Sequence, residues 1–370
     1  MQNTLGIAVK TAQRYEGIQC LRAVAALLVM WAHFKFSSNS SLLNYPMIQT
    51  SAGSIGVDVF FVISGFVIAL TASKINNSWR TFIIHRIARV VPLYYLTSIY
   101  FAVYIINHYG FIPHQALNTL IFIPLFNIND FANPYHPFGW TICFEIWFYI
   151  AFATSLIFAK SLTIKIFPVA FMIASALVLT QYNGKYVLPS FLFHPLVLEF
   201  CAGIYLYRAR NFFGKPALFL FIAASISSAF LVLDTEKLGY HTEVLSDPSL
   251  GALRALIWGG FSLFLVGTFI ALDNCKVKWP HTFTHLGDAS YSLYLIQPYT
   301  LKLASKLTTY SEIEWLGPLL FTLFTLSAAL ILHHLIEKPL TKLCRTHLEK
   351  VIGMEKDKTR LENQAFNQSS

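Results

Sequence analysis

Charged residues are scarce in this chain. Only 12% of its 370 residues are Asp, Glu, Lys or Arg, whereas 55% are hydrophobic. A soluble domain carries about a quarter charged residues, so this chain has too few charges to cover a globular surface. Its apolar residues also fall in long blocks, which indicates that lipid is its solvent. We therefore expect an all-α, polytopic integral membrane protein without a separate soluble domain.

Cysteine pairs and the common catalytic signatures are also missing. The five cysteines form no Cys-x-x-Cys pair, so neither a disulfide framework nor a zinc site is expected, and the thiols are predicted to be buried and inert. No GxSxG, HExxH, Walker A or GxGxxG pattern stands in a suitable context. Residues 1–16 lack the apolar core and cleavage site of a signal peptide. We expect no serine triad, no P-loop motor, no metal and no tightly bound cofactor.

Long hydrophobic runs are what the sequence has in abundance. A helix needs about 20 apolar residues to cross the bilayer core, and the runs predict about ten transmembrane helices. Their approximate bounds are 17–36, 53–72, 91–109, 138–159, 166–181, 190–207, 216–233, 251–272, 287–305 and 315–335. The block 116–126, which Pro113 and Pro124 bracket, is too short and is predicted to be interfacial or re-entrant.

Cations concentrate in every second connection between these spans. The net charge of +9 therefore predicts membrane orientation rather than nucleic-acid binding. The connections after the even-numbered spans, together with the tail, hold Lys74, Arg80, Arg86, Arg89, Lys160, Lys165, Arg208, Arg210, Lys215, Lys276, Lys278, Lys338, Lys342 and Arg345. This pattern places both termini in the cytoplasm. We predict a cytoplasmic N-terminal segment at 1–16, a membrane domain at 17–345 and a polar, disordered cytoplasmic tail at 346–370.

The first span carries an arginine and a histidine on one face. Arg22 and His33 are eleven residues apart, which is close to three whole helical turns and roughly 16 Å along the axis. Charged groups inside a bilayer are costly and usually line a cavity or pair with one another. Singly, Arg22 can be a snorkelling anchor and His33 a satisfied interfacial histidine. Together, with acids at similar depth, they favour a functional role.

Two of those acids lie in the second and fourth spans. Asp58 is near the outer end of its span, and Ser64 and Gly65 follow about two turns deeper, where Gly65 would let another helix or a ligand approach closely. Glu145 lies in the fourth span, where it is either functional or a structural partner of a buried cation. By depth, His33, Asp58 and Glu145 are candidates to converge in the outer half of the membrane.

The remaining candidates have equally ordinary explanations. Glu199 in the sixth span is a candidate site residue or a partner of a neighbouring helix, and Asp288 is a candidate or a helix N-cap. Arg86 and Arg89 stand at i and i+3 on one helical face. They are either positive-inside anchors or a fork for the phosphates of an anionic cytosolic donor.

With these residues, the chain resembles the acyltransferase-3 family of membrane O-acyltransferases, in particular its exopolysaccharide-production type. The resemblance runs from about Ile18 to Pro339 and rests on seven stretches in order, each weak alone. They are Gln19 to Ala23 with His33, Gly56 to Phe66, Arg86 to Pro92, Trp140 to Glu145 with Phe148-Tyr149, Leu198 to Phe200 with Gly203, Leu286 to Leu295, and Glu337 to Pro339. Many members have a histidine after the sixth stretch; here Gln297 and Pro298 stand there, so no proton-transfer role is assigned to that position.

The resemblance implies transfer of an acyl group, with acetyl favoured, from cytosolic acyl-CoA as co-substrate to a hydroxyl of an extracytoplasmic polysaccharide or lipid-linked glycan. His33 would be the general base, Glu145 or Asp58 would orient it, and Arg22 would hold the donor or polarise its carbonyl. Arg86 and Arg89 would bind the phosphates of CoA. Ser64, Glu199 and Tyr291 are further candidates.

The resemblance also implies a multi-pass protein of a bacterial inner membrane, with glycan-assembly proteins as further candidate partners. The aromatic residues Tyr135, Phe138 and Trp140 are expected to be exposed and either to pack on sugar rings or to anchor the protein at the interface. Two alternatives from other classes stay open at this point. A secondary transporter also needs charges at the midplane, although no pair of similar halves with broken helices is visible. A structural or sensor membrane protein would show no turnover.

Overall fold

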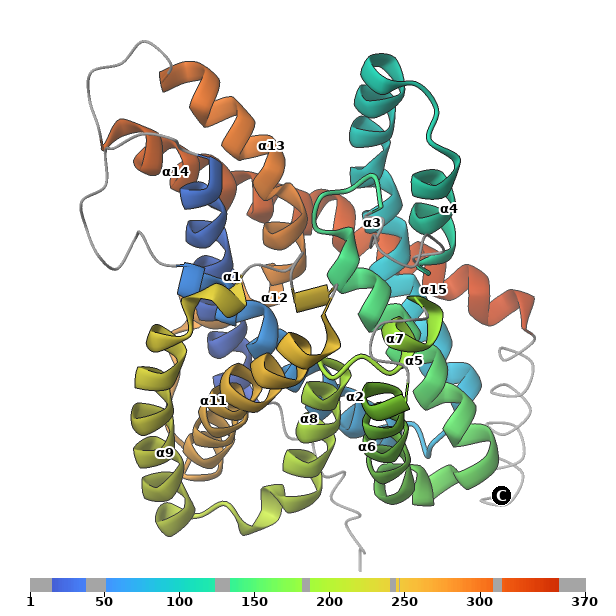
Figure 1. Ribbon diagram of the computed structural model, residues 1–370, viewed down its shortest axis with the longest axis vertical. Helices are drawn as coiled ribbons and strands as arrows, with labels where there is room; N and C mark the ends of the chain where they lie inside the picture. Colours follow the sequence, from blue (N-terminus) through green and yellow to red (C-terminus); the bar gives the residue numbers. More distant parts are fainter. Residues whose placement is uncertain are drawn as a thin grey trace, which may run out of the picture.

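The computed structural model describes residues 15–37, 51–123, 134–181, 187–239, 244–245, 247–308 and 315–352, and these residues form helices and turns without a β-strand. Figure 1 shows the resulting bundle. Its helical elements are α1 (Glu16–Ser37), η1 (Ser51–Ser54), α2 (Ile55–Lys74), α3 (Trp79–Tyr109), α4 (Pro113–Ile121), α5 (Gly139–Ala159), η2 (Lys160–Leu162), α6 (Thr163–Gln181), α7 (Val187–Leu192), α8 (Val197–Ala209), η3 (Arg210–Phe212), α9 (Lys215–Asp234), η4 (Glu236–Gly239), α11 (Pro248–Asn274), α12 (His281–Asp288), α13 (Ser290–Thr308), α14 (Leu316–Leu332), the π-helical turn η5 (His333–Glu337) and α15 (Lys338–Val351).

Seven stretches of the described residues are long and apolar enough to cross a membrane. They are Ala52–Lys74, Trp79–Tyr109, Gly139–Gln181, Leu188–Phe212, Lys215–Asp234, Pro248–Asn274 and Leu316–Val351. Gly139–Gln181 holds two of the predicted spans, as α5 and α6. The first and ninth predicted spans are helical too, as α1 and α13, but they are not among the seven. The all-α polytopic fold is confirmed, whereas the count of ten and the location of the termini remain predictions.

Helix α2 forms the centre of the bundle. It packs against α1, α8 and α11, and most of its side chains are buried. Helix α9 is the opposite case: it stands at the edge of the bundle in Figure 1, and Val232 is the only apolar side chain that it buries. In a lipid solvent such exposure is expected, because lipid tails are as apolar as the side chains they meet. The charged residues of α2 and its neighbours are therefore the ones held away from lipid.

Two glycines allow α2 and α8 to lie very close together. A Cβ at Gly65 would stand 1.9 Å from the backbone oxygen of Phe200, and one at Gly203 would stand 2.0 Å from that of Val62. Small residues at helix crossings permit this approach in membrane proteins. The close approach predicted at Gly65 is therefore made by another helix, α8.

The cationic connections meet at one end of the bundle, which we call the basic end. There, Asn274 Nδ2 donates to the carbonyl of Arg210 at 2.7 Å, linking the end of α11 to η3. Asp273 accepts the Gly17 N–H at 2.8 Å, which satisfies a free donor at the start of α1. His85 of α3 contacts Glu349 of α15 at 3.1 Å. The basic end thus joins the start of α1 to α3, η3, α11 and α15.

Three elements differ from the predicted pattern. Helix α3 begins at Trp79, twelve residues before the predicted span, because Ser78 caps it and the basic segment continues the helix. Helix α4 has nine residues and is too short to cross a bilayer, as expected for the 116–126 block, although 124–126 lie outside the described residues. Helix α15 continues to Val351, six residues past the predicted domain boundary at 345, because Glu349 also bonds to Arg345.

Candidate functional site

A cavity of about 100 Å³ lies inside the bundle between α1, α2, α3, α5 and α13, and we call it the inner cavity. Its volume is enough for several water molecules. Its polar lining consists of Arg22, Ser64, Arg86, Arg89, Thr141, Glu145, Tyr149, Ser290, Tyr291 and Tyr294. Six of the residues singled out in the sequence therefore meet here: Arg22, Ser64, Arg86, Arg89, Glu145 and Tyr291.

Glu145 is the acidic group of this cavity. Its Oε1 accepts a hydrogen bond from Ser64 Oγ at 2.9 Å, and it also accepts one from the hydroxyl of Tyr149. Tyr149 lies one helical turn further along α5, so the helix itself places the two side chains together. Arg86 lies 5.6 Å from the Tyr149 ring, which adds a positive charge on the same side. The carboxylate is thus held in place by α2, α3 and α5.

Arg22 stands where the inner cavity approaches the basic end. Its Nη1 donates to Gln19 Oε1 at 3.1 Å, one turn earlier on α1. The charges that act on its guanidinium are those of Arg89, Glu337, Asp288 and Glu145. Such a group inside a membrane protein attracts a polar or anionic ligand group, because its charge is poorly screened there.

A second cavity, of about 580 Å³, lies beside the first at the basic end, and we call it the polar basin. Its lining residues are Arg89, Asp288, His333, Glu337, Lys338, Thr341, Lys342, Arg345, Thr346 and Glu349. Arg89 lines both cavities. Four of the lining side chains are Lys or Arg and three are Asp or Glu, and Arg345 bonds to Glu349, so the basin carries both signs of charge with cations in slight excess.

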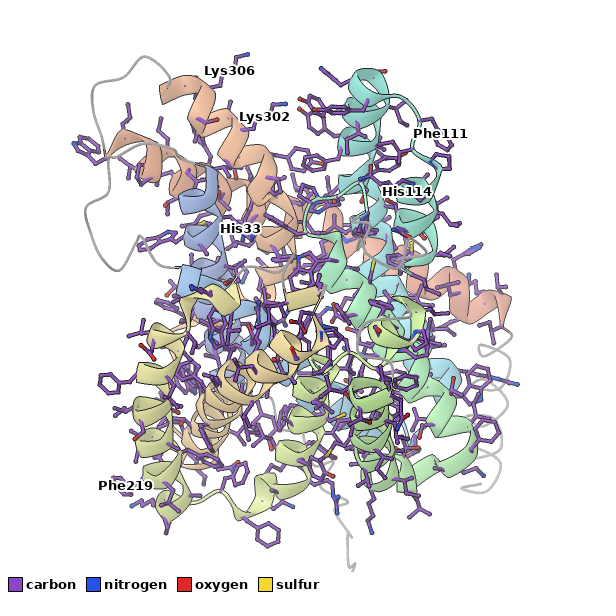
Figure 2. All side chains as sticks on the ribbon, viewed as in Figure 1. His33, Phe111, His114, Phe219, Lys302 and Lys306 are labelled. Atoms are coloured by element: carbon purple, nitrogen blue, oxygen red, sulfur yellow. The ribbon has the colours of Figure 1, made fainter. Side chains whose placement is uncertain are left out.

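His33 lies on the same helix as Arg22 but does not line the inner cavity. Figure 2 shows it where α1 runs beside α13. Its Nδ1 is 3.1 Å from Gln297 Oε1, and its ring stacks on Phe138 with centroids 3.9 Å apart. Phe138 in turn contacts Tyr294, a lining residue of the inner cavity, at 5.3 Å. Phe138 therefore lies between His33 and Tyr294, which lines the inner cavity.

Gln297 is a residue that sequence reasoning left without a role. It follows the Ser-Tyr-Ser-Leu-Tyr-Leu segment, and its side chain is buried. The hydrogen bond to His33 spans 264 residues of the chain, so no local pattern predicts it. At Nδ1 of His33 the structure places the amide of Gln297, where the sequence predicted Asp58 or Glu145.

Asp58 is not part of the predicted outer cluster with His33 and Glu145. Its carboxylate is fully buried and makes two hydrogen bonds with Arg254 of α11, at 2.9 and 2.7 Å. Glu199 lies beside this pair, with its side chain against Gly259 of α11. Asp58 pairs with Arg254 because a buried carboxylate requires a cationic partner, and the packing of α2 against α11 places Arg254 next to it. Asp58, and Glu199 with it, belong to a structural cluster between α2, α8 and α11.

Arg86 and Arg89 both line the inner cavity, but they differ in their other contacts. Arg86 is buried, donates to Thr71 Oγ1 and to the carbonyl of Val67 at 3.4 Å, and lines only the inner cavity. Arg89, one turn further along α3, reaches the basin as well. The pair diverges because Arg86 faces α2 and α5 whereas Arg89 lies at the junction of the two cavities.

The aromatic residues before α5 are also placed differently. Tyr135, Phe138 and Trp140 are all buried, at 4%, 9% and 5% exposure, so they are not an exposed sugar-binding surface. His136 lies among them and donates from Nε2 to the carbonyl of Leu295, 3.2 Å away. Burial lowers its pKa to about 4, so it is neutral near pH 7. This segment packs against α13 and holds the ring on which His33 stacks.

All five cysteines are free, and Cys20, Cys143 and Cys201 are buried as predicted, whereas Cys275 and Cys344 are half-buried. Within the described parts of the chain, no group of three or more His, Cys, Asp or Glu side chains is arranged to hold a metal ion.

A multi-pass helical membrane protein with buried charges around two adjoining cavities is the class that this fold and site define. The family described as acyltransferase domain matches residues 15–334, so the chain belongs to the acyltransferase-3 family. It is an O-acyltransferase, and this membership separates it from the transporter and the sensor considered above.

Two curated proteins are similar to this chain. The exopolysaccharide production protein ExoZ of Rhizobium meliloti (strain 1021) is 29% identical over 270 residues, which cover 69% of this chain and 78% of ExoZ. The putative peptidoglycan O-acetyltransferase YrhL of Bacillus subtilis (strain 168) is 29% identical over 160 residues, or 38% of this chain and 23% of YrhL. No solved structure matches the chain.

Proposed function

We propose that this protein transfers an acyl group, with acetyl favoured, from cytosolic acyl-CoA to a hydroxyl of an extracytoplasmic polysaccharide or lipid-linked glycan. We place it in a bacterial inner membrane, with the basic end in the cytoplasm. The names of the two relatives, one for exopolysaccharide production and one for peptidoglycan O-acetylation, support the acceptor class and the acetyl group.

The observation that supports this proposal most directly is the shared position of Arg89. It lines a basin with four cationic side chains and also the inner cavity, where Arg22 and Glu145 lie. CoA has an anionic nucleotide at one end and a thioester at the other. The basin suits the phosphates, and the inner cavity suits the pantetheine arm and the thioester. Acyl-CoA is thus a co-substrate that enters from the basic end.

In the proposed reaction, His33 removes the proton of the acceptor hydroxyl, because a hydroxyl is a weak nucleophile until its proton is taken. The oxygen attacks the thioester carbonyl carbon, the new C–O bond forms and the C–S bond breaks. The thiolate of CoA leaves and takes up a proton. Gln297 Oε1 accepts from Nδ1 of His33, so Nε2 is the basic nitrogen. Arg22, three turns from His33 along α1, holds the donor in the inner cavity.

Ser64, Tyr291 and Arg86 have supporting roles in this proposal. Ser64 holds Glu145, and the hydroxyl of Tyr291 donates to the carbonyl of Val90 at 2.7 Å, which fixes its ring against the cavity. Arg86 lies against the ring of Tyr149, whose hydroxyl bonds to Glu145, so its positive charge offsets that of the carboxylate. These residues position the thioester site.

Two substitutions test the proposal when each is assayed for two properties. His33→Ala should abolish O-acylation of the glycan, measured by its mass, while the purified protein still binds labelled acyl-CoA. Arg89→Ala should weaken acyl-CoA binding, because the residue that links the two cavities is lost. His108→Ala and Arg80→Ala are matched controls, since both side chains are exposed on α3, and both should behave as wild type.

The two assays together distinguish loss of the base from loss of donor binding. Wild-type glycan acylation in His33→Ala would contradict the proposed base. Unchanged acyl-CoA binding in Arg89→Ala would contradict the donor path through the basin.

A further inference from the structure

Aromatic and cationic side chains of α3 and α13 meet at the end of α3 that lies away from the basic end. Lys302 Nζ of α13 donates to the hydroxyl of Tyr100 at 3.0 Å and lies 4.3 Å from the centroid of the Tyr104 ring. Tyr299 of α13 packs against Tyr100 with ring centroids 5.2 Å apart. Figure 2 shows Lys306 further out along α13. We call these five residues the outer patch.

The rings of the outer patch are accessible. Tyr100 is 42% exposed and Tyr104 is 37% exposed, and both lysines are exposed as well. Lipid does not account for this exposure, because an ammonium group is costly in lipid and Lys302 lies against both rings. The two rings therefore face water or the headgroup region. Exposed rings that cluster on such a surface indicate a site for a partner.

The charge of the outer patch selects the kind of partner. An ammonium group has three hydrogen-bond donors, and among the described residues Tyr100 is the one acceptor that Lys302 reaches. Helices α3, α4 and α13 contain no Asp or Glu. Charged surfaces associate with surfaces of complementary charge. An anionic partner is therefore the one that suits the two lysines.

A series of ring contacts leads from the outer patch to the proposed base. The ring centroid of Tyr299 lies 4.9 Å from that of Phe101, which lies 5.2 Å from that of His136. His136 in turn contacts Phe138, the ring on which His33 stacks. A molecule bound at the outer patch is thus bound next to the side chains that hold His33.

We propose that the outer patch binds an acidic glycan chain, whose sugar rings pack on the tyrosines and whose anionic groups bind Lys302 and Lys306. The apolar faces of sugar rings pack on aromatic rings, and lysine binds carboxylate or phosphate as a point charge. Lys306 is nine residues beyond Gln297, the partner of His33, or about 13.5 Å along α13. That length exceeds one sugar ring, so a chain is needed to reach both the lysines and the base. That this glycan is the acyl acceptor rests on the proposed function.

The test measures the Kd of an oligogalacturonate for the full-length protein in neutral detergent, next to the Kd of its methyl-esterified form. The two oligosaccharides have the same rings, but esterification removes the negative charges. The outer patch contacts ring faces and charges rather than particular hydroxyls, so this generic probe should bind. The esterified form should bind several-fold more weakly. No binding of the acidic form at millimolar concentration, or equal affinity for the two forms, would overturn the inference.

Lys302→Gln/Lys306→Gln tests the two cations. Each exposed ion pair contributes modestly, so this variant should bind the acidic form roughly two- to thirtyfold more weakly and should lose the preference for it. Lys165→Gln/Lys215→Gln is the matched control, because it also removes two exposed lysines, one from α6 and one from α9. It should keep the wild-type affinity. Equal losses in the two variants would show attraction to net charge alone and contradict a site at the outer patch.

Tyr104→Ala distinguishes a glycan site from a membrane anchor, since aromatic residues also anchor proteins at the membrane interface. The variant should bind the acidic form more weakly at an unchanged thermal unfolding midpoint. Tyr109→Ala is its control: it removes a 73% exposed ring from the same helix but outside the outer patch, and should bind as wild type. If Tyr104→Ala lowered the midpoint or membrane insertion and left binding unchanged, the ring would be an anchor and the inference would be wrong.

Acylation assays distinguish failure of this inference from failure of the proposed function. Lys302→Gln/Lys306→Gln should lower O-acylation of the glycan in cells, while the purified variant binds acyl-CoA as the wild type does. If the wild type binds oligogalacturonate but acylates no glycan, the proposed function is wrong and the glycan site stands. If the double variant loses oligogalacturonate binding but acylates normally, the glycan bound at the outer patch is not the acceptor. If it keeps that binding, the inference is wrong and the proposed function stands.

Discussion

At the scale of single residues, the same side chain has different roles in different surroundings. Asp58 and Glu145 are both carboxylates of membrane helices, yet Asp58 is enclosed with Arg254. Glu145 is half-buried, lines a cavity and, among the described residues, accepts hydrogen bonds from the hydroxyls of Ser64 and Tyr149. A carboxylate whose charge is matched by an adjacent guanidinium is held for structure. One that is held by hydroxyls keeps its charge available to a ligand. The partner, rather than the residue type, separates the two cases.

Asp58→Asn should therefore destabilise the protein without removing its chemistry. Removing one partner of a buried ion pair leaves the other charge unpaired, at a cost of about 3–5 kcal/mol. We expect a lower thermal unfolding midpoint in detergent, with acylation activity per folded molecule close to that of the wild type. Asp234→Asn is the control, because Asp234 is exposed at the end of α9, and its midpoint should not move. An Asp58→Asn protein of normal stability and no activity would show that Asp58 acts in catalysis.

At the scale of helices, close packing between α2 and α8 places two sets of residues. Helix α2 presents Ser64 to the inner cavity on one side and Asp58 to Arg254 on another. Its distance from α8 is set by backbone contact at Gly65 and Gly203. Because the contact is backbone to backbone, neither helix can yield by changing a side-chain rotamer. The position of α2, and with it the cavity wall, depends on these two residues.

Gly203→Ala should push the two helices apart. The new methyl group would stand 2.0 Å from the carbonyl oxygen of Val62, and overpacking of this kind costs about 1–3 kcal/mol. We expect a lower unfolding midpoint and reduced activity, measured on the same preparation. Gly260→Ala is the matched control: Gly260 is also inside a helix, α11, but nothing lies within 4 Å of the added methyl group. That variant should be as stable as wild type or slightly more, because alanine favours the helix by about 0.5–1 kcal/mol. Equal effects of the two substitutions would contradict the role of the close approach.

At the scale of the whole molecule, the site residues follow helix α1 across the bundle. Arg22 lies near the basic end beside the two cavities, and His33 lies three turns further along. Figure 2 places Lys302 and Lys306 beyond His33, towards the end of α13. If the basic end is cytoplasmic, donor and acceptor approach the reacting atoms from opposite sides of the membrane. The orientation of the bundle is thus part of the proposed mechanism.

The orientation is measurable with a membrane-impermeant maleimide. In Cys275→Ser, Cys344 on α15 is the one cysteine that is not buried. It should react in inverted vesicles and not in intact cells, because α15 lies at the basic end. In Cys275→Ser/Cys344→Ser/Lys306→Cys, the new thiol replaces an exposed lysine of α13 and should react in intact cells. Labelling of Cys344 in intact cells would contradict the predicted topology.

Local sequence properties were enough to predict most of the helices and the helical face that Arg22 and His33 share. Hydropathy over about 20 residues decides whether a segment enters the bilayer, so the predicted spans fall largely on helices of the structure, although the sixth is broken at 193–196 between α7 and α8 and the ninth begins in α12. The helical period likewise places Arg22 and His33 on one face. The pairing of residues far apart was decided only by tertiary structure. Arg254 is 196 residues from Asp58, and Gln297 is 264 residues from His33. Nothing within one helix specifies such contacts, because they depend on which helices pack together and at what depth, and that packing is what pairs Asp58 with Arg254 and makes Glu145 part of a cavity.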